Sequence, residues 1–211
     1  NRFKAMSSKS QLFQPLQIRG LSLPNRLVIS PMCQYSADDG LANDWHLAHL
    51  GKLAQGGAAV VFTEAAAVQR RGRITHGDLG IWTDAHAQAL AGIARFISSM
   101  GSVPAIQLAH AGRKASMQRP WHGNGPLDDS DRARGDEPWP VVGPSAIALG
   151  EGWLVPSEMT PAEIAQGVED FVAAARRADD AGFGIVELHA AHGYLAASFL
   201  SPISNHRTDI Y

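Results

Sequence analysis

Short runs of apolar residues alternate with longer segments of helical periodicity along the chain. The apolar runs occupy residues 27–31, 59–63, 103–108 and 185–189. Each run predicts a buried strand because it is short and rich in Val, Ile or Leu. Strands that alternate with helices are typical of parallel βα units. The pattern therefore predicts four such units.

Two helices are predicted after the first two strands. The first covers residues 44–55 and stops at the glycine pair that follows it. The second opens near Asp84 and meets Gly101 at the C-cap position. Their apolar positions recur at helical spacing and predict one apolar side for each helix. These positions are Leu47, Leu50 and Leu53 in the first helix, and Leu90, Ile93, Ala94 and Ile97 in the second.

A third helix, before the last strand, has the clearest start signal in the chain. Thr160 is expected to be its N-cap, Pro161 its first residue, and Glu163 the partner that completes a capping box. Gly182 is expected to end it. The residues expected to face the core are Ile164, Val168, Phe171, Val172 and Ala175.

The segment before this helix, about residues 117–156, is rich in Pro, Gly and Asp and has no clear periodicity. An irregular connection of this length usually carries a functional or partner-binding surface. We therefore expect it to be a long loop with such a role.

The polar residues at the strand ends distinguish two possible α/β folds. They cluster after each predicted strand, at residues 31–35, 64–65, 107–114 and 189–194. In a (β/α)8 TIM barrel this rim is where active sites are built. A doubly wound nucleotide-binding sheet should instead show a Gly-x-Gly-x-x-Gly turn after a strand, and none of the four strands is followed by one. The sequence favours the barrel.

Chain length limits how much of a barrel can be present. A complete barrel takes about 250 residues, whereas the chain has 211 and shows four of the eight units. We expect residues 6–211 to be the N-terminal half of a single barrel, with the remaining strands supplied by another segment or polypeptide. Residues 1–5 precede a plausible start at Met6 and are expected to be vector-derived or disordered.

Composition narrows the class of protein. A formal charge of −2 indicates neither a nucleic-acid partner nor a membrane surface, and no apolar run is long enough to cross a bilayer. The single cysteine, Cys33, cannot form an internal disulfide and fits a reducing compartment. A cytoplasmic, globular protein is expected.

Several separate stretches together resemble the old yellow enzyme family of flavin-dependent ene-reductases. They are NRLVISPMCQY at residues 25–35, QLAHAGRK at 107–114 and HAAHGYL at 189–195, and the similarity continues through residues 199–211. Cys33 and the second histidine at position 192 are similar to the cysteine-containing branch that includes xenobiotic reductases. The resemblance covers nearly the whole chain from about Phe13.

The resemblance implies an oxidoreductase that uses FMN and takes hydride from NADPH or NADH. Its substrates would be small molecules with an activated C=C bond, such as α,β-unsaturated carbonyl compounds. The phosphate-binding residues of the flavin would lie in the complementary C-terminal half-barrel, present in cis or in trans. The complete protein is expected to be a homo-oligomer.

His189, His192 and Tyr194 are the expected catalytic residues. Two imidazoles that converge can donate hydrogen bonds to a carbonyl oxygen and stabilise developing enolate charge, and a nearby phenol can act as general acid. Spacing alone also allows one of the histidines to be a packed supporting group. A metal pair, as in a barrel hydrolase or lyase, is the other alternative, although no second cluster of His, Cys or Asp lies nearby in the sequence.

The resemblance assigns the cofactor and substrate contacts. Ser30, Pro31, Met32, Cys33 and Ala65 would line the flavin, with backbone contacts from residues 31–33 and from Ala65. Gln107 would bind the pyrimidine edge, since a carboxamide offers both a donor and an acceptor. Tyr35 would contact the substrate together with the two histidines.

Some of these residues, and their neighbours, have plainer interpretations. From the sequence only, Cys33 is a small buried apolar residue and Gln107 could simply fix a loop. The resemblance gives Glu64 a structural role, and Arg113 and Lys114 could be solvated or could hold the loop after the third strand. An inactive half-barrel fragment is the alternative from outside enzymology.

Overall fold

The computed structural model describes residues 10–211, so the segment predicted to be vector-derived lies outside the described residues. Its centre is a parallel sheet in the order β3 (Val28–Ile29), β4 (Val60–Ala67), β5 (Val103–Ala109) and β8 (Ile185–Leu188). Strand order follows chain order, as it does around a parallel barrel. The prediction of four βα strands is confirmed.

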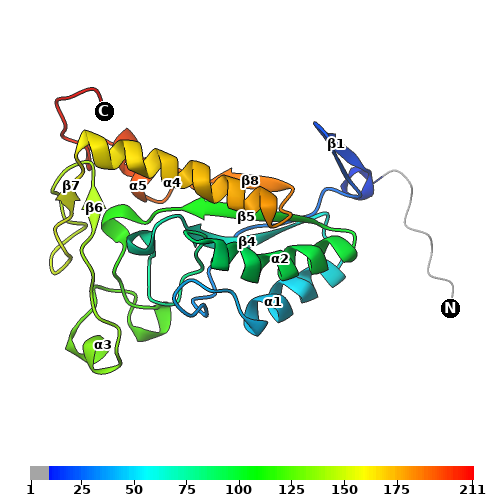
Figure 1. Ribbon diagram of the computed structural model, residues 1–211, viewed down its shortest axis with the longest axis horizontal. Helices are drawn as coiled ribbons and strands as arrows, with labels where there is room; N and C mark the ends of the chain where they lie inside the picture. The colour runs from blue at the N-terminus through cyan, green and yellow to red at the C-terminus, as the bar shows by residue number, and fades with distance from the viewer. Residues whose placement is uncertain (1–9) are drawn as a thin grey trace.

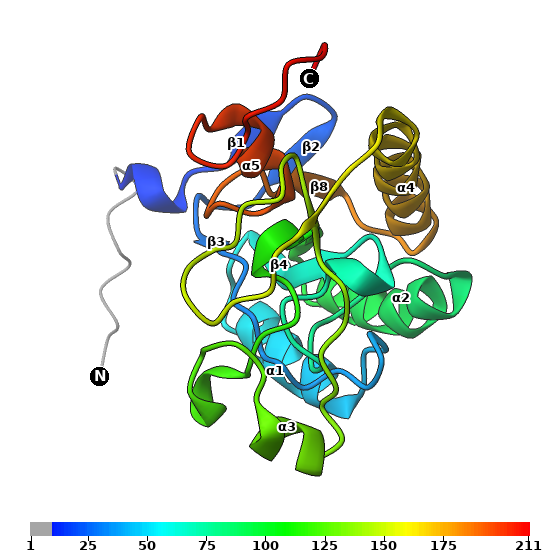
Figure 2. The same cartoon turned by 90° about the vertical axis from the view of Figure 1, so that its left-hand side faces the viewer.

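Three long helices cover one face of this sheet. They are α1 (Asp44–Gln55), α2 (Asp84–Ser99) and α4 (Pro161–Asp180), and they form an arc around the sheet when the molecule is seen from the end that carries the long loops (Figure 2). The predicted capping box of α4 is present, with the Thr160 hydroxyl accepting the Glu163 N–H at 3.2 Å and the Glu163 carboxylate accepting the Thr160 N–H at 2.9 Å. The predicted bounds of α1 are also confirmed.

The residues of β5 show how the two faces of the sheet differ. Ile106 and Leu108 are fully buried in the main apolar cluster together with residues of α2 and α4. Ala105, one position away, packs in a different cluster with the N-terminal segment, and Gln107 contacts Glu187 of β8. Because side chains alternate along a strand, one face meets the helices and the other is the inner face of the curved sheet.

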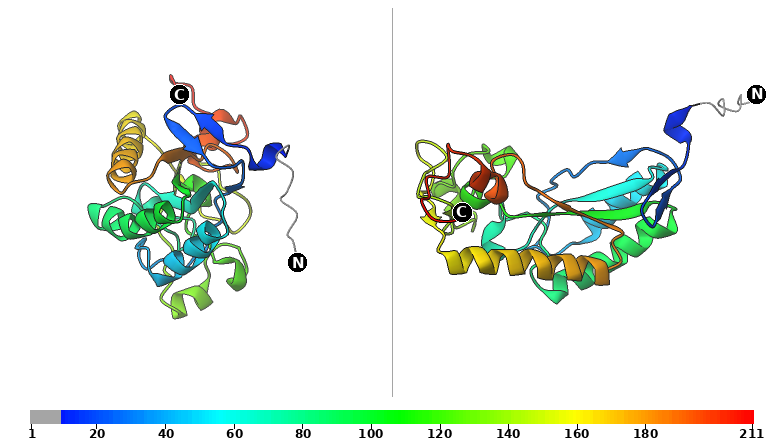
Figure 3. Two further views of the ribbon diagram at one scale, coloured as in Figure 1. Left: turned by 90° about the vertical axis from the view of Figure 1, so that its right-hand side faces the viewer. Right: turned by 90° about the horizontal axis from the view of Figure 1, so that it is seen from above.

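An N-terminal hairpin covers the amino ends of the central strands. Its strands β1 (Leu16–Ile18) and β2 (Leu21–Leu23) pair antiparallel after a short 3₁₀ turn, η1 (Gln11–Phe13). Leu23 is buried against Ala59, Val60 and Ala105. The hairpin was not predicted, and it lies at the opposite end of the molecule from the long loops (Figures 1 and 3).

The carboxyl ends of the strands carry the remaining short elements (Figure 1). In chain order these short elements are η2 (Arg70–Gly72), η3 (Gly112–Lys114), η4 (Pro120–His122), α3 (Asp129–Ala133), β6 (Val142–Gly143), β7 (Ser157–Glu158) and α5 (Leu195–Leu200). The connection between β5 and α4 contains η3, η4, α3, β6 and β7, so it is not a featureless loop.

Two predicted strand lengths are wrong. The strand expected at residues 27–31 pairs only at Val28–Ile29, since Pro31 has no N–H for a ladder and the chain then turns toward Glu64. The strand expected at 59–63 continues to Ala67 through a register shift between Phe62 and Ala65. Pairing with β5 extends it, although alanine has a low intrinsic strand preference.

The predicted inner face of α4 is partly wrong. Val168 and Val172 are exposed, at 58% and 37% of their surface. The buried residues are Ile164 and the small Gly167, Ala174 and Ala178, with Phe171 and Ala175 half-buried beside them. Small side chains let α4 lie close to α2 and the sheet, which leaves the valine flank uncovered within residues 10–211.

Both edges of the central sheet carry exposed apolar side chains. Val28 lies on β3, and Val186 and Leu188 lie on β8, with Leu188 63% exposed. Unpaired, apolar strand edges favour association with further strands. Within the described residues no helix is both long enough and apolar enough to cross a membrane.

Candidate active site

The inner face of the sheet carries one cross-strand row near the carboxyl ends of its strands. Ala65 pairs in register with Gln107, and Gln107 pairs with Glu187. The Gln107 Nε2 donates to Glu187 Oε1 at 2.6 Å. A small methyl group is thus followed by a fixed carboxamide and a carboxylate along this row.

His189, His192 and Tyr194 converge beyond the end of β8. The His189 N–H bonds the Leu108 carbonyl at 2.9 Å, so this residue is held by the neighbouring strand. His192 and Gly193 both have positive φ, which turns the chain back so that the three rings meet. Ring centroids are 4.9 Å apart for His189 and His192, 4.8 Å for His189 and Tyr194, and 6.2 Å for His192 and Tyr194.

The protonation of these rings suits hydrogen-bond donation. His189 Nδ1 accepts the Ala191 N–H at 3.3 Å, so the neutral ring carries its proton on Nε2. Burial, followed by the neighbouring His192, lowers the pKa of His189, and burial raises the pKa of Tyr194 above its ordinary value. Among residues 10–211, neither His189 Nε2 nor the Tyr194 hydroxyl has a hydrogen-bond partner, so both can serve a ligand.

Arg113 and Lys114 hold the surrounding loops. The Lys114 Nζ donates to the His192 carbonyl at 2.6 Å and lies 6.0 Å from the centre of the Tyr194 ring. Arg113 Nη1 donates to the carbonyl of Ile147 at 3.3 Å. Of the two interpretations that the sequence allowed, the loop-holding one is confirmed.

Cys33 and Tyr35 approach the same rings from the segment after β3. The Gln34 N–H between them donates to the buried Glu64 carboxylate at 3.0 Å, whose other oxygen lies 3.2 Å from His46 Nε2 of α1. Glu64 therefore has the expected structural role. Tyr35 has a φ of +54°.

The chemical state of these two side chains follows from their surroundings. Burial, with smaller effects of the Asp78 and Glu64 charges, raises the pKa of Cys33 to about 12. Burial likewise raises the pKa of Tyr35 above its ordinary value. At neutral pH both residues are therefore uncharged donors.

The turn at residues 74–78 supports Tyr35 from behind. Asp78 is fully buried and accepts the Thr75 N–H at 3.1 Å and the Thr75 hydroxyl at 2.8 Å. Burial raises the pKa of Asp78 to about 7 in spite of these bonds. A Cβ on Gly77 would lie 2.2 Å from the Tyr35 carbonyl oxygen, so only glycine allows this approach.

The structure brings together only part of the predicted site. Cys33 and Tyr194 pack around the same apolar cluster, which includes Ile74 and Ala111, and Tyr35 lies close enough for both of these residues to affect its pKa. Ser30 and Met32 are exposed, and both line a narrow space with residues of α1 rather than the ring cluster.

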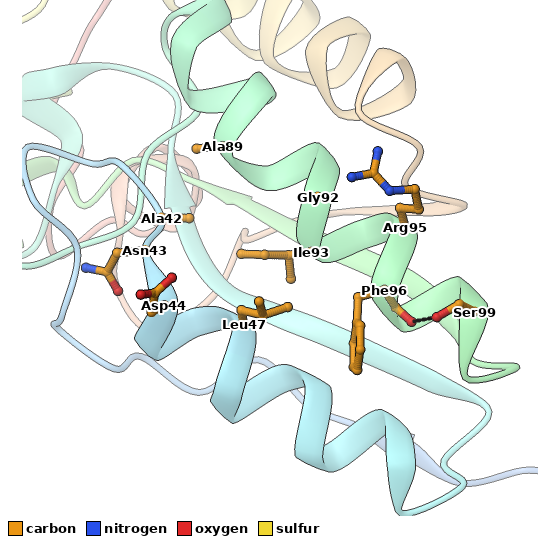
Figure 4. Close-up of a pocket in the computed structure, with 10 residues that line it drawn as sticks. All are labelled: Ala42, Asn43, Asp44, Leu47, Ala89, Gly92, Ile93, Arg95, Phe96 and Ser99. Atoms are coloured by element: carbon orange, nitrogen blue, oxygen red, sulfur yellow. Dashed lines mark hydrogen bonds between the residues drawn. The ribbon is translucent and has the colours of Figure 1, made fainter.

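A second hollow lies away from these residues. It is a groove of about 600 Å³ between α1 and α2, where Leu47, Ile93 and Phe96 converge (Figure 4). Leu47 lines this groove instead of being buried with Leu50. No predicted site residue is among its lining residues.

The sequence did not indicate two residues that the tertiary structure brings to the site, Asp78 and Trp121. Asp78 fixes the turn behind Tyr35, and the Trp121 ring packs edge-to-face on Tyr35 with centroids 5.9 Å apart. An aromatic residue in a Pro- and Gly-rich stretch was the only available signal for Trp121. Asp78 had none, because its role depends on contacts that spacing does not reveal.

A metal site at His189 and His192 would need further ligating side chains nearby. Within residues 10–211 there is no group of three or more His, Cys, Asp or Glu side chains arranged to hold a metal ion. Glu187, the acid nearest to His189 along β8, bonds the Gln107 side chain. Among residues 10–211, the His189 and His192 pair therefore lacks the additional ligands that catalytic zinc sites use.

Fold and site together define a segment of parallel βα barrel with a polar site at the carboxyl ends of its strands. The profile of the NADH:flavin oxidoreductase / NADH oxidase family matches residues 11–211. The chain is 48% identical to an NADH:flavin oxidoreductase of Gibberella zeae, over 97% of this chain and 49% of that protein. It is 43% identical to an NADPH dehydrogenase of Bacillus subtilis, over 95% of this chain and 54% of that protein.

Solved structures agree with these sequence matches. The old yellow enzyme of Pichia sp. AKU4542 superposes with a TM-score of 0.80 at 29% identity, covering 95% of this chain and 51% of that one. Morphinone reductase superposes with a TM-score of 0.78 at 30% identity, covering 96% and 54%.

The chain belongs to the NADH:flavin oxidoreductase / NADH oxidase family. The resemblance to old yellow enzymes and the TIM-barrel fold class are confirmed. The chain spans about half the length of the curated relatives that it matches.

Proposed function

We propose that this chain supplies the rim residues of an FMN-dependent oxidoreductase that reduces activated C=C bonds with NADPH or NADH. The observation that carries the proposal is the cluster of His189, His192 and Tyr194 at the end of β8, with two unpartnered donors beside Cys33 and Tyr35. Family membership supports the flavin and the nicotinamide donor.

The residues of the inner face fit a flavin. Gln107 uses one N–H on Glu187, and its Oε1 has no hydrogen-bond partner among residues 10–211. A carboxamide fixed in this way offers an acceptor and a remaining N–H to a ring edge that has both kinds of group. Ala65, next to it in the row, has no side chain that would block a flat ring.

The cofactor would be held by Gln107, by Ala65 and by the backbone of residues 30–33. When bound, FMN supplies the hydride that it has received from NADPH or NADH. We assign its phosphate to the complementary C-terminal half of the barrel, in cis or in trans. The apolar edges at β3 and β8 support such a partner, since they expose Val28 and Leu188.

The histidine pair would bind the substrate oxygen. His189 presents a neutral Nε2–H, and His192 lies beside it. Two donors aimed at one oxygen favour the form of the substrate in which negative charge has developed there. Tyr35 would add a third donor on the carbonyl side, and Tyr194 would deliver the proton to carbon.

The alternatives are less well supported. A metal-dependent hydrolase or lyase that uses His189 and His192 is not favoured, since the family is a flavin family and the described residues offer the pair no further ligands. An inactive half-barrel is an outcome of the experiment below. The cytoplasmic location and the homo-oligomeric state expected from the sequence belong to this proposal.

The proposal is tested by the absorption spectrum of the complete assembly. We expect stoichiometric flavin, bleaching by NADPH without oxygen, and recovery of colour when 2-cyclohexenone is added. The 211-residue chain alone should not bind FMN tightly. Stoichiometric metal without flavin, or flavin that no alkene reoxidises, would contradict the proposed function, and tight FMN on the isolated chain would contradict the need for a second half.

Replacing Cys33 with alanine should make the flavin potential more negative. A neutral thiol is a weak donor that favours the more electron-rich reduced cofactor. A weak hydrogen bond of about 0.5–1 kcal/mol corresponds to roughly 10–20 mV for a two-electron couple. Because the pKa of Cys33 is about 12, the difference between variant and parent should be the same at pH 6 and pH 9. Redox titration checks this, and identical potentials would leave Cys33 a packing residue.

A further inference from the structure

Trp121 is a large aromatic residue left in solvent beside the proposed substrate phenol. Its side chain is 60% exposed, and its ring packs on Tyr35 with centroids 5.9 Å apart and planes at 78°. Edge-to-face packing of this kind favours one orientation of the indole, whereas Tyr35 is supported by the turn at residues 74–78. The exposed part of the indole is therefore held next to Tyr35 rather than free in the loop.

The segment that carries Trp121 is a defined structure, which we call the tryptophan arch (residues 117–126). Its ends are joined by a bridge between Met117 and Pro126, and the Gln118 N–H bonds the Gly125 carbonyl at 2.9 Å. The buried Gln118 side chain donates to Asp131 at 2.7 Å. Trp121 thus stands at the top of a closed, internally bonded loop.

The arch rests on the same turn that supports Tyr35. The Met117 N–H donates to the Ile74 carbonyl at 2.9 Å, and Arg119, paired with Asp136 at 2.9 Å, lies against Gly77. Met117 also packs with Cys33 and Tyr194 around one apolar cluster. The arch and the ring cluster are therefore joined by direct contacts.

The position of Trp121 indicates that the remaining barrel strands would not bury its side chain. Those strands would join at the edges β3 and β8, whereas the arch follows β5, which has neighbours on both sides. The tryptophan arch holds the exposed Trp121 indole beside the polar residues of the site. An exposed apolar surface in such a place commonly marks a ligand-binding site. An indole face suits a flat, apolar ring, since aromatic rings gain from stacking beyond their buried area.

We infer that Trp121 forms the outer wall of the substrate pocket above Tyr35 and favours alkenes that carry an aromatic ring over compact ones. This inference rests on the proposed function. The substrate class that it selects is that of aryl-substituted α,β-unsaturated carbonyl compounds. Trp121 takes no part in hydride or proton transfer.

The test compares two substrates in the complete flavin-loaded protein. Trp121→Ala should lower kcat/KM for cinnamaldehyde by about three- to tenfold, the range for loss of one aromatic contact, mainly through KM. The value for 2-cyclohexenone and the rate of flavin reduction by NADPH should change less than twofold. Trp121→Phe should restore most of the preference for cinnamaldehyde. Trp153→Ala, in the loop before β7, is the control and should leave kcat/KM unchanged for both substrates.

The outcomes separate this inference from the function itself. An equal loss with both alkenes, or no loss with either, overturns the role of Trp121 while the function stands. Normal selectivity with altered assembly would assign Trp121 to a subunit contact and also overturn it. If the parent protein binds no flavin or reduces neither alkene, the proposed function fails instead.

Discussion

Tyr194→Phe should slow alkene reduction by about 100- to 10,000-fold, the usual contribution of a positioned general acid, while flavin reduction by NADPH proceeds at the parent rate. The variant keeps the ring that packs on His189 at 4.8 Å and removes only the hydroxyl. Hydride addition leaves an enolate-like carbon that must be protonated, whereas flavin reduction needs no such acid. Stopped-flow measurement of each half-reaction separates the two effects.

The role of Tyr194 also predicts how the rate of alkene reduction depends on the substrate and on pH. Nitroalkenes should be affected least, because their nitronate products can leave unprotonated. Burial raises the pKa of Tyr194 above its ordinary value of about 10, so the parent should not lose rate between about pH 7 and pH 9 through this group. Tyr35→Phe is the matched control and should act mainly on substrate binding. If Tyr194→Phe is reoxidised by an enone as fast as the parent, the proton comes from elsewhere.

Removing either histidine of the pair should cost about 100- to 1,000-fold in alkene reduction, as loss of one donor to a developing oxyanion typically does. His189→Ala should have at least as large an effect as His192→Ala, since its Nε2–H is fixed by the bond from the Ala191 N–H to Nδ1. Phenolic ligands, which mimic the enolate oxygen, should bind more weakly to both variants. Flavin reduction by nicotinamide should also slow if its carboxamide uses the same donors.

The histidine prediction is checked by titrating a phenol into the oxidised protein and by single-turnover reoxidation. His206→Ala is the matched control, because His206 is held by the Pro202 carbonyl outside the ring cluster. Unchanged phenol affinity in both pair variants would count against the carbonyl-binding role. A loss for His189 only would make His192 the packed supporting group that sequence spacing also allowed.

Local sequence signals were sufficient wherever the physical cause is local. The capping box of Thr160 and Glu163 is formed within four residues, and the helix that it starts lies where it was predicted. The glycine pair after residue 55 likewise ends α1 at the expected position. Apolar runs identified all four central strands. The two inner strands, β4 and β5, are buried on both faces, which leaves a continuous apolar pattern.

Contacts between distant segments decided the rest. The extension of β4 to Ala67 depends on pairing with β5, and the exposure of Val168 depends on which flank of α4 meets α2. Neither is encoded in the periodicity of its own segment. An apolar residue at helical spacing predicts a face, but the neighbouring elements determine whether that face is covered.

The site shows the same division. The sequence by itself determined which residue types stand at the strand ends, and the resemblance assigned roles to His189, His192 and Tyr194. Only the tertiary structure brought Tyr35 beneath Trp121, 86 positions apart along the chain, and buried Asp78 in the turn behind Tyr35. Loop residues meet because several strands end at one rim, and this proximity arises only when the sheet has formed.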